Sequence, residues 1–87
     1  MRSQLLAARA AALFTSDLPA GSWPSAALVE AAIVASVRTR GGTRGCVAEL
    51  AAAYGDYPET AVTRMRWARS VIQSVYEQPP AELALAA

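Results

Sequence analysis

Arginine supplies every positive charge in this 87-residue chain, which has eight arginines, no lysine and no histidine. Six arginines stand against three carboxylates between Arg38 and Arg69 (net +3), and two stand against four in the remainder (net −2). A guanidinium group binds phosphate oxygens, and its fork also pairs two acceptors on the edge of a guanine. The chemistry that this segment offers is therefore contact with nucleic acid.

Catalysis has little support in the residue types. Histidine, the commonest general base and a frequent metal ligand, is absent. The glycine-rich stretch GGTRG lacks the lysine and hydroxyl residue that end a phosphate-binding loop. The single Cys46 excludes an internal disulfide and a cysteine-based zinc site, so we expect it to be a small buried hydrophobe. The sequence predicts no enzyme activity, no metal and no cofactor.

Four predicted helices must position the arginines. Apolar periodicity, interrupted by glycine and proline, predicts helices over about 4–15, 23–40, 46–54 and 58–78. The predicted fold class is all-α, a small four-helix bundle in one domain over residues 1–78 with a flexible tail over 79–87. The second helix is apolar nearly all round, so we expect it in the middle of the bundle. The buried stripe predicted for the first helix comprises Leu6, Ala10, Leu13 and Phe14.

The third predicted helix has one apolar face, and the fourth has an apolar face and a polar arc opposite it. Val47, Leu50, Ala51 and Tyr54 follow the i, i+3, i+4, i+7 pattern of one buried helix face. Gly55 is expected to end that helix in the left-handed conformation, and Pro58 suits the first turn of the next one. The buried face predicted for the last helix comprises Ala61, Met65, Ala68, Ile72, Val75 and Tyr76. The polar arc opposite comprises Thr60, Thr63, Arg66, Trp67, Ser70 and Ser74.

The stretch from Gly45 to Glu77 resembles the helix-turn-helix family of DNA-binding domains. Four residues of the first helix and turn carry the resemblance: Leu50, Ala51, Tyr54 and Gly55. Beyond the turn, Tyr57, Val62 and Met65 fit the positions that pin the second helix if the turn has one extra residue. Without it, Ala61 and Arg64 would be buried, which is unfavourable for an arginine. Within the family, AELAAAYGDYPETAVTRMRWAR is most similar to the C-terminal promoter-reading domain of sigma factors, over roughly a third of the chain.

The resemblance implies that the exposed face of the last helix enters the major groove. The residues expected to face the bases are Glu59, Thr60, Thr63, Arg64 and Trp67, with Arg66 and Arg69 nearer the phosphates. Arg38, Arg40 and Arg44 lie in the predicted loop RTRGGTRG. This loop either follows a phosphate backbone or is a solvated segment whose arginines serve the preceding helix end.

The function that these features favour is a small transcriptional regulator that binds double-stranded DNA. Much of the 54% hydrophobic content is alanine, which buries little area, so a homodimer is expected. The alternative is an all-helical docking module that binds a protein, such as the transcription machinery, through Trp67, Tyr57 and Tyr54. We expect a cytoplasmic protein with no membrane partner, and read the arginine and alanine bias chiefly as that of a bacterial high-GC genome. The final Leu85, Ala86 and Ala87 resemble a bacterial degradation tag.

Overall fold

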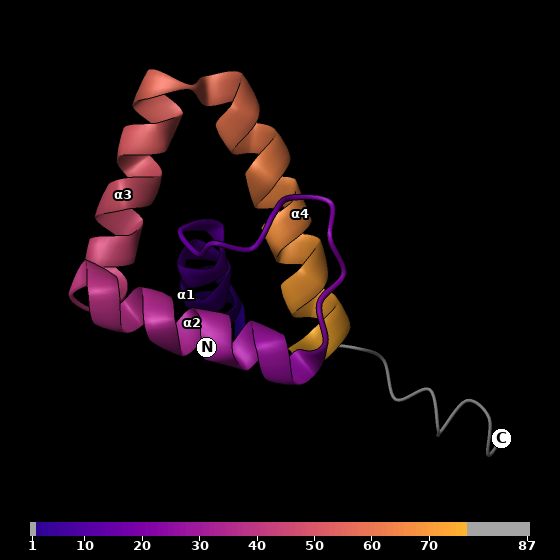
Figure 1. Cartoon of the computed structure of the whole chain (residues 1–87). Helices are drawn as coiled ribbons and strands as arrows, with labels where there is room; N and C mark the ends of the chain where they lie inside the picture. The colour runs from indigo at the N-terminus through magenta and orange to yellow at the C-terminus, as the bar shows by residue number, and fades with distance from the viewer. Residues whose placement is uncertain (1, 77–87) are drawn as a thin grey trace, which may run out of the picture.

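The computed structural model describes residues 2–76, which form four α-helices and no strand. These are α1 (Arg2–Phe14), α2 (Ala26–Arg40), α3 (Thr43–Asp56) and α4 (Pro58–Tyr76). Helices α2, α3 and α4 make the three sides of a triangle, and α1 passes through its middle (Figure 1). The predicted all-α, four-helix fold is confirmed. The predicted tail over 79–87, its degradation signal and the end of the last helix near residue 78 lie outside the described residues.

The central helix is α1, not α2 as the sequence predicted. α1 packs against each of the other three helices, and Ala10, Ala11, Ala12, Leu13 and Phe14 are all buried. Three consecutive alanines allow neighbouring helices to approach α1 closely from different sides. α2 is also apolar nearly all round, yet only Val29 and Ser36 of α2 are buried. Both α1 and α2 are therefore apolar on nearly all sides, although α1 is central and the outer side of α2 faces solvent.

The core lies mainly between α1 and α4. Its largest fully buried side chains are Leu13 of α1, Val29 of α2, Cys46 of α3, and Val71 and Ile72 of α4. Burying an aliphatic side chain of this kind contributes about 1.5–3 kcal/mol. The stripe predicted for the first helix is buried, and the face predicted for the last helix is buried or packs against the core cluster. The expectation that Cys46 is a buried hydrophobe is confirmed, because its exposed fraction is 0%.

Local sequence signals set the two ends of α2. Ser25 has extended backbone angles, and its hydroxyl accepts a hydrogen bond from the Leu28 amide at 3.2 Å. This is an N-cap contact, so α2 begins at Ala26 rather than at the predicted Trp23. At the other end Gly41 takes φ +80°, and the Gly42 amide donates to the Val37 carbonyl at 2.7 Å. The left-handed glycine ends α2 at Arg40, which is the predicted last residue.

The corner between α2 and α3 is tighter than the sequence suggested. Only Gly41 and Gly42 separate the two helices, so the loop predicted over 38–45 does not form. Gly45 lies in the first turn of α3, directly against the end of α2. A Cβ atom added to it would overlap the Arg40 carbonyl oxygen and would lie 2.6 Å from the Arg40 carbonyl carbon. The absence of a side chain at Gly45 is therefore what allows the two helices to meet.

The buried face of α3 is rotated from the predicted one. Cys46 is buried and Leu50 and Ala53 pack against the core, whereas Val47 is 47% exposed and Tyr54 36% exposed. Cys46 and Ala53 are seven residues apart, as are Val47 and Tyr54, so spacing alone does not distinguish the two faces. Contact with α1 selects the face that contains Cys46.

The predicted stop at Gly55 is also wrong. Gly55 is helical and α3 continues to Asp56, after which Tyr57 takes φ −139° and its amide bonds to the Ala53 carbonyl. Pro58 explains this position, because a proline disfavours the helical conformation of the residue before it. One residue, Tyr57, therefore joins α3 to α4.

Candidate nucleic acid-binding surface

Arg64 is hydrogen-bonded to the chain's own backbone. Its Nε donates to the Phe14 carbonyl at 2.7 Å, and its Nη2 donates to the carbonyls of Ser16 at 2.9 Å and Leu18 at 2.8 Å. Burial lowers the pKa of Arg64 from its ordinary value, but a guanidinium stays charged throughout the physiological range. Its charge matches the partial negative charge at the C-terminal end of α1. Arg64 therefore does not face outward as predicted.

This placement also decides the register of α4. Ala61 is 2% exposed and Arg64 is partly buried, whereas Val62 is 39% and Tyr57 70% exposed. The predicted extra residue in the turn is therefore wrong. Burial of an arginine is tolerated here because backbone carbonyls satisfy its donors.

Arg40, at the end of α2, also donates to a backbone carbonyl at the C-terminal end of α1. Its Nη2 donates to the Thr15 carbonyl at 3.1 Å and lies 3.2 Å from the Glu49 carboxylate of α3. This is the only ion pair among the side chains that the structure describes, those of residues 4–76. The predicted loop had two interpretations: contact with a phosphate backbone, or arginines that interact with the end of the preceding helix. Arg40 does interact with a helix end, but that end belongs to α1 and not to the preceding helix α2.

Trp67 is buried, with only 8% of its surface exposed. Its Nε1 donates to the Ser22 carbonyl at 2.7 Å, and the guanidinium carbon of Arg64 lies 4.9 Å from the centre of its ring. The segment over residues 15–25, which joins α1 to α2, covers this side chain. Trp67 was expected to face DNA or a protein partner, but it packs against the chain itself. Neither DNA nor a protein partner is needed there.

Replacing Trp67 with phenylalanine is expected to lower the free energy of unfolding by about 1–2 kcal/mol, because the Ser22 carbonyl loses its donor. Chemical denaturation followed by circular dichroism measures this change. Trp23, which is 68% exposed, supplies the matched control. Trp23→Phe should leave the free energy within about 0.5 kcal/mol of the parent. Equal losses in the two variants would contradict the assigned role of Trp67.

The solvent-facing arc of α4 holds most of the remaining predicted residues. Its members are exposed and recur at spacings of three and four: Glu59, Thr63, Arg66, Arg69, Ser70 and Gln73, here called the α4 outer face. Thr60 is exposed beside it at the start of the helix. Thr63 donates to the Glu59 carbonyl at 3.2 Å, so its hydroxyl oxygen remains free to accept. Gln73 was not among the residues predicted to contact DNA, although it follows Arg66 and Arg69 by seven and four positions.

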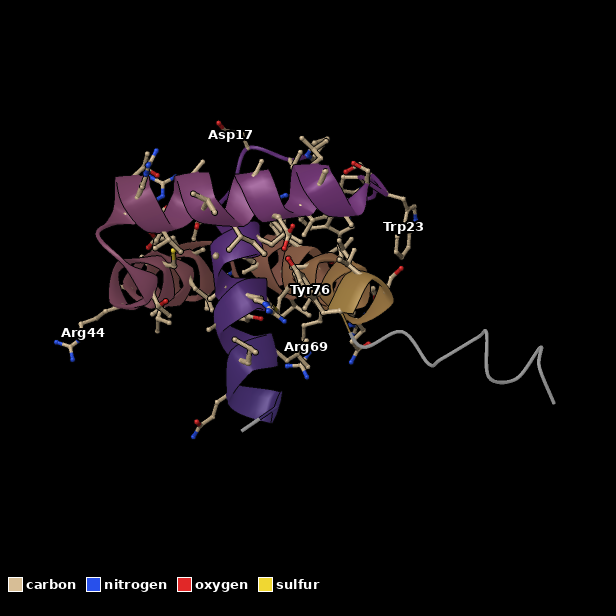
Figure 2. All side chains as sticks on the ribbon, turned by 90° about the horizontal axis from the view of Figure 1, so that it is seen from below. Asp17, Trp23, Arg44, Arg69 and Tyr76 are labelled. Atoms are coloured by element: carbon tan, nitrogen blue, oxygen red, sulfur yellow. The ribbon has the colours of Figure 1, made fainter. Side chains whose placement is uncertain are left out.

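The exposed arginines fall into two groups rather than one. Arg66 and Arg69 belong to the α4 outer face, whereas Arg38 and Arg44 are exposed at the α2–α3 corner. Figure 2 shows Arg44 and Arg69 at separate places, with the N-terminal half of α1 projecting between them. The structure therefore does not bring all the predicted DNA-contacting residues onto one surface.

The predicted protein-docking surface does not form as a unit. Trp67 is buried, and Tyr54 stacks on Phe14 with ring centres 6.3 Å apart. Tyr57 is the one member that stands out from the chain, at the α3–α4 turn.

A shallow pocket adjoins the N-terminal half of α4. Its volume is about 490 Å³, and it is lined by Ala20, Glu59, Thr60, Thr63 and Arg64. Glu59 and Thr63 of the α4 outer face border this depression, which lies beside the 15–25 segment.

Tyr76 closes the other end of α4. The Arg9 guanidinium lies 3.8 Å from the centre of the Tyr76 ring. Burial raises the pKa of Tyr76, and the neighbouring Glu30 carboxylate raises it further, while Arg9 opposes both effects. These contacts tie α4 to α1 and α2.

A metal site, a membrane-spanning helix and a similarity to known proteins would each point to a function, and none of them is found for the described residues. Within residues 2–76 no group of histidine, cysteine or carboxylate side chains is placed to hold a metal ion. None of the helices there combines the length and apolar character that a membrane span requires. No family model, no curated protein and no solved structure matches the chain. The resemblance to helix-turn-helix domains thus stays a prediction.

Proposed function

We propose that this protein is a small regulator that binds duplex DNA through the α4 outer face. The observation that carries the proposal is the pairing of two exposed arginines, Arg66 and Arg69, with hydrogen-bonding side chains on one arc of a 19-residue helix. No carboxylate among the described residues forms an ion pair with either arginine. From Glu59 to Gln73 this arc extends about 21 Å, at 1.5 Å per residue, and a helix of this width fits the major groove.

Within this proposal we assign the residues of α4 different roles from those expected from the sequence. One stripe of the α4 outer face holds Thr63, Arg66 and Gln73. The Arg66 side chain suits guanine and the Gln73 side chain suits adenine, whereas Thr63 can bind a base edge or a phosphate. Arg69 lies at the edge of the stripe, where a phosphate contact is natural. Arg64 and Trp67 act indirectly, because they hold the 15–25 segment against α4 and leave the outer face open.

The affinity of one copy for DNA should be modest. Only two arginines of the α4 outer face are available for phosphate or base contacts, and Glu59 offsets one of them. If both neutralise a phosphate, the slope of log K against log salt should be about −1.8. Binding to random-sequence DNA should therefore weaken noticeably between about 50 and 200 mM salt.

Fluorescence anisotropy of labelled duplex DNA, titrated at these two salt concentrations, tests the proposal. Arg66→Gln and Arg69→Gln are each expected to weaken binding about 5-fold or more and to reduce the salt slope by about 1. Arg44→Gln makes the same charge change at the α2–α3 corner and should leave binding nearly unchanged.

Two results would overturn this assignment. Equal losses in all three variants would show that DNA follows net charge rather than the α4 outer face. Absence of binding at the lower salt concentration would favour the protein-docking alternative. That alternative would then rest on Tyr57 and Val62, which are 70% and 39% exposed near the α3–α4 turn.

A further inference from the structure

The outward side of α2 is an apolar surface on the rim of the molecule. Its central stripe consists of Ala27, Ala31, Val34, Ala35 and Arg38, with Leu28 and Glu30 on the two edges; these seven residues, here called the α2 outer face, are all exposed. Val34 is 55% exposed and Leu28 48%. Apart from Glu30 on one edge and Arg38 at the end, the face has no charge.

No element among residues 2–76 covers this face. The opposite side of α2, with Val29 and Ser36, packs inward and is buried. In Figure 2 α2 lies along the upper side, whereas Arg69 of the α4 outer face points to the lower side. A solvent-facing helix normally has charged and polar residues on its outer arc, and a contiguous apolar arc marks an interaction surface.

We propose that the α2 outer face binds a second copy of this chain, with the two α2 helices antiparallel about Val34. Glu30 and Arg38 stand four residues before and four residues after Val34. In an antiparallel pair related by a two-fold axis, each Arg38 then lies at the height of the partner's Glu30. The same face therefore supplies both halves of two identical ion pairs. A parallel arrangement would instead place the like charges beside each other.

The neighbouring residues fit this arrangement. Ala27, Ala31 and Ala35 allow the two helix backbones to approach closely, with Val34 of each copy at the centre. Glu30 is already positioned, because its carboxylate lies beside Tyr76 and raises the pKa of that residue. A carboxylate has two oxygens and can serve both Tyr76 and a partner's arginine.

The dimer should be weak. α2 has 15 residues and is about 22 Å long, so one helix pair covers less than the roughly 800 Å² per partner of a typical stable interface. We expect a dissociation constant on the order of 10 μM, with monomer at low concentration and dimer at high concentration. This inference does not depend on DNA binding, since it concerns a different face.

Sedimentation equilibrium of the full chain, from about 1 to several hundred micromolar, tests the pairing. Val34→Glu should abolish the dimer, because it places two carboxylates at the centre of the seam. Val47→Glu is the matched control, since Val47 is a similarly exposed valine on α3, and it should dimerise like the parent. Far-UV circular dichroism confirms that each variant keeps its helices.

Charge reversal tests the antiparallel register. Glu30→Arg and Arg38→Glu are each expected to weaken the dimer about 5-fold or more, because each brings like charges together. The double variant, or an equimolar mixture of the two single variants, should recover association. A parent that stays monomeric at every concentration would overturn the proposal. Equal effects of Val34→Glu and Val47→Glu, or no recovery in the double variant, would also overturn it.

Discussion

Gly45→Ala is expected to lower the free energy of unfolding by about 2–3 kcal/mol, which is a large part of the stability of a chain this small. The new Cβ would overlap the Arg40 carbonyl, a backbone group that cannot turn aside. Relief requires α2 and α3 to separate at their corner, which would also strain the contacts that Arg40 makes with Thr15 and Glu49. Urea denaturation followed by far-UV circular dichroism measures the change.

Gly55→Ala provides a control with the same chemical change. Gly55 also lies within α3, but a Cβ added there would meet no atom within 4 Å. Alanine favours the helix over glycine by about 0.5–1 kcal/mol, so this variant should be as stable as the parent or more stable. If both glycine variants had the same midpoint, the close approach of α2 and α3 at Gly45 would be refuted.

Arg64→Ala is the second substitution with a large expected effect, a loss of about 2–4 kcal/mol. It leaves the carbonyls of Phe14, Ser16 and Leu18 without their donor and exposes one side of the Trp67 ring. The three bonds are not additive, because water can reach this partly buried site. Arg64→Lys should recover less than half of the loss, since an ammonium lacks the planar fork that reaches three acceptors.

Arg66→Ala is the matched control for Arg64→Ala. Arg66 lies two residues further along α4 and is exposed, so its removal should change the free energy of unfolding by no more than about 0.5 kcal/mol. The two variants should also separate in function, with Arg66→Ala losing DNA affinity while fully folded. Similar denaturation midpoints for both variants would show that Arg64 does not hold the 15–25 segment.

The sequence was sufficient for features that depend on neighbouring residues. The stripe from Leu6 to Phe14 is buried because residues three and four apart share a helix face whatever that face meets. Gly41 ends α2 at the predicted residue, and its amide bonds to the Val37 carbonyl four positions earlier. Helix type, number and approximate bounds follow from such local rules.

Two predicted helix ends failed for local reasons, because Ser25 caps α2 and Pro58 sets the end of α3. The other features that failed depend on which surfaces meet. A helical wheel shows that α1 and α2 are both apolar, but not which of them the other helices surround. The same reason applies to two residues expected to face the bases: the donors of Arg64 and Trp67 bind backbone carbonyls of a segment about 45–50 residues earlier. Backbone acceptors carry no sequence signature. Arg66 and Arg69 are exposed as expected because no such acceptor lies near them in the described chain.

The hydrogen bonds of Arg64 to the end of α1 affect when the chain can fold during its synthesis. The hydrogen bonds join residues 46 to 50 positions apart, and they tie the first helix to the last. At about 5–20 residues per second, the end of α1 waits for roughly 2.5–10 s before its partner in α4 has been made. Until then the central helix has no complete surroundings. We therefore expect a nascent chain without α4 to stay unfolded and the finished domain to fold in one cooperative step.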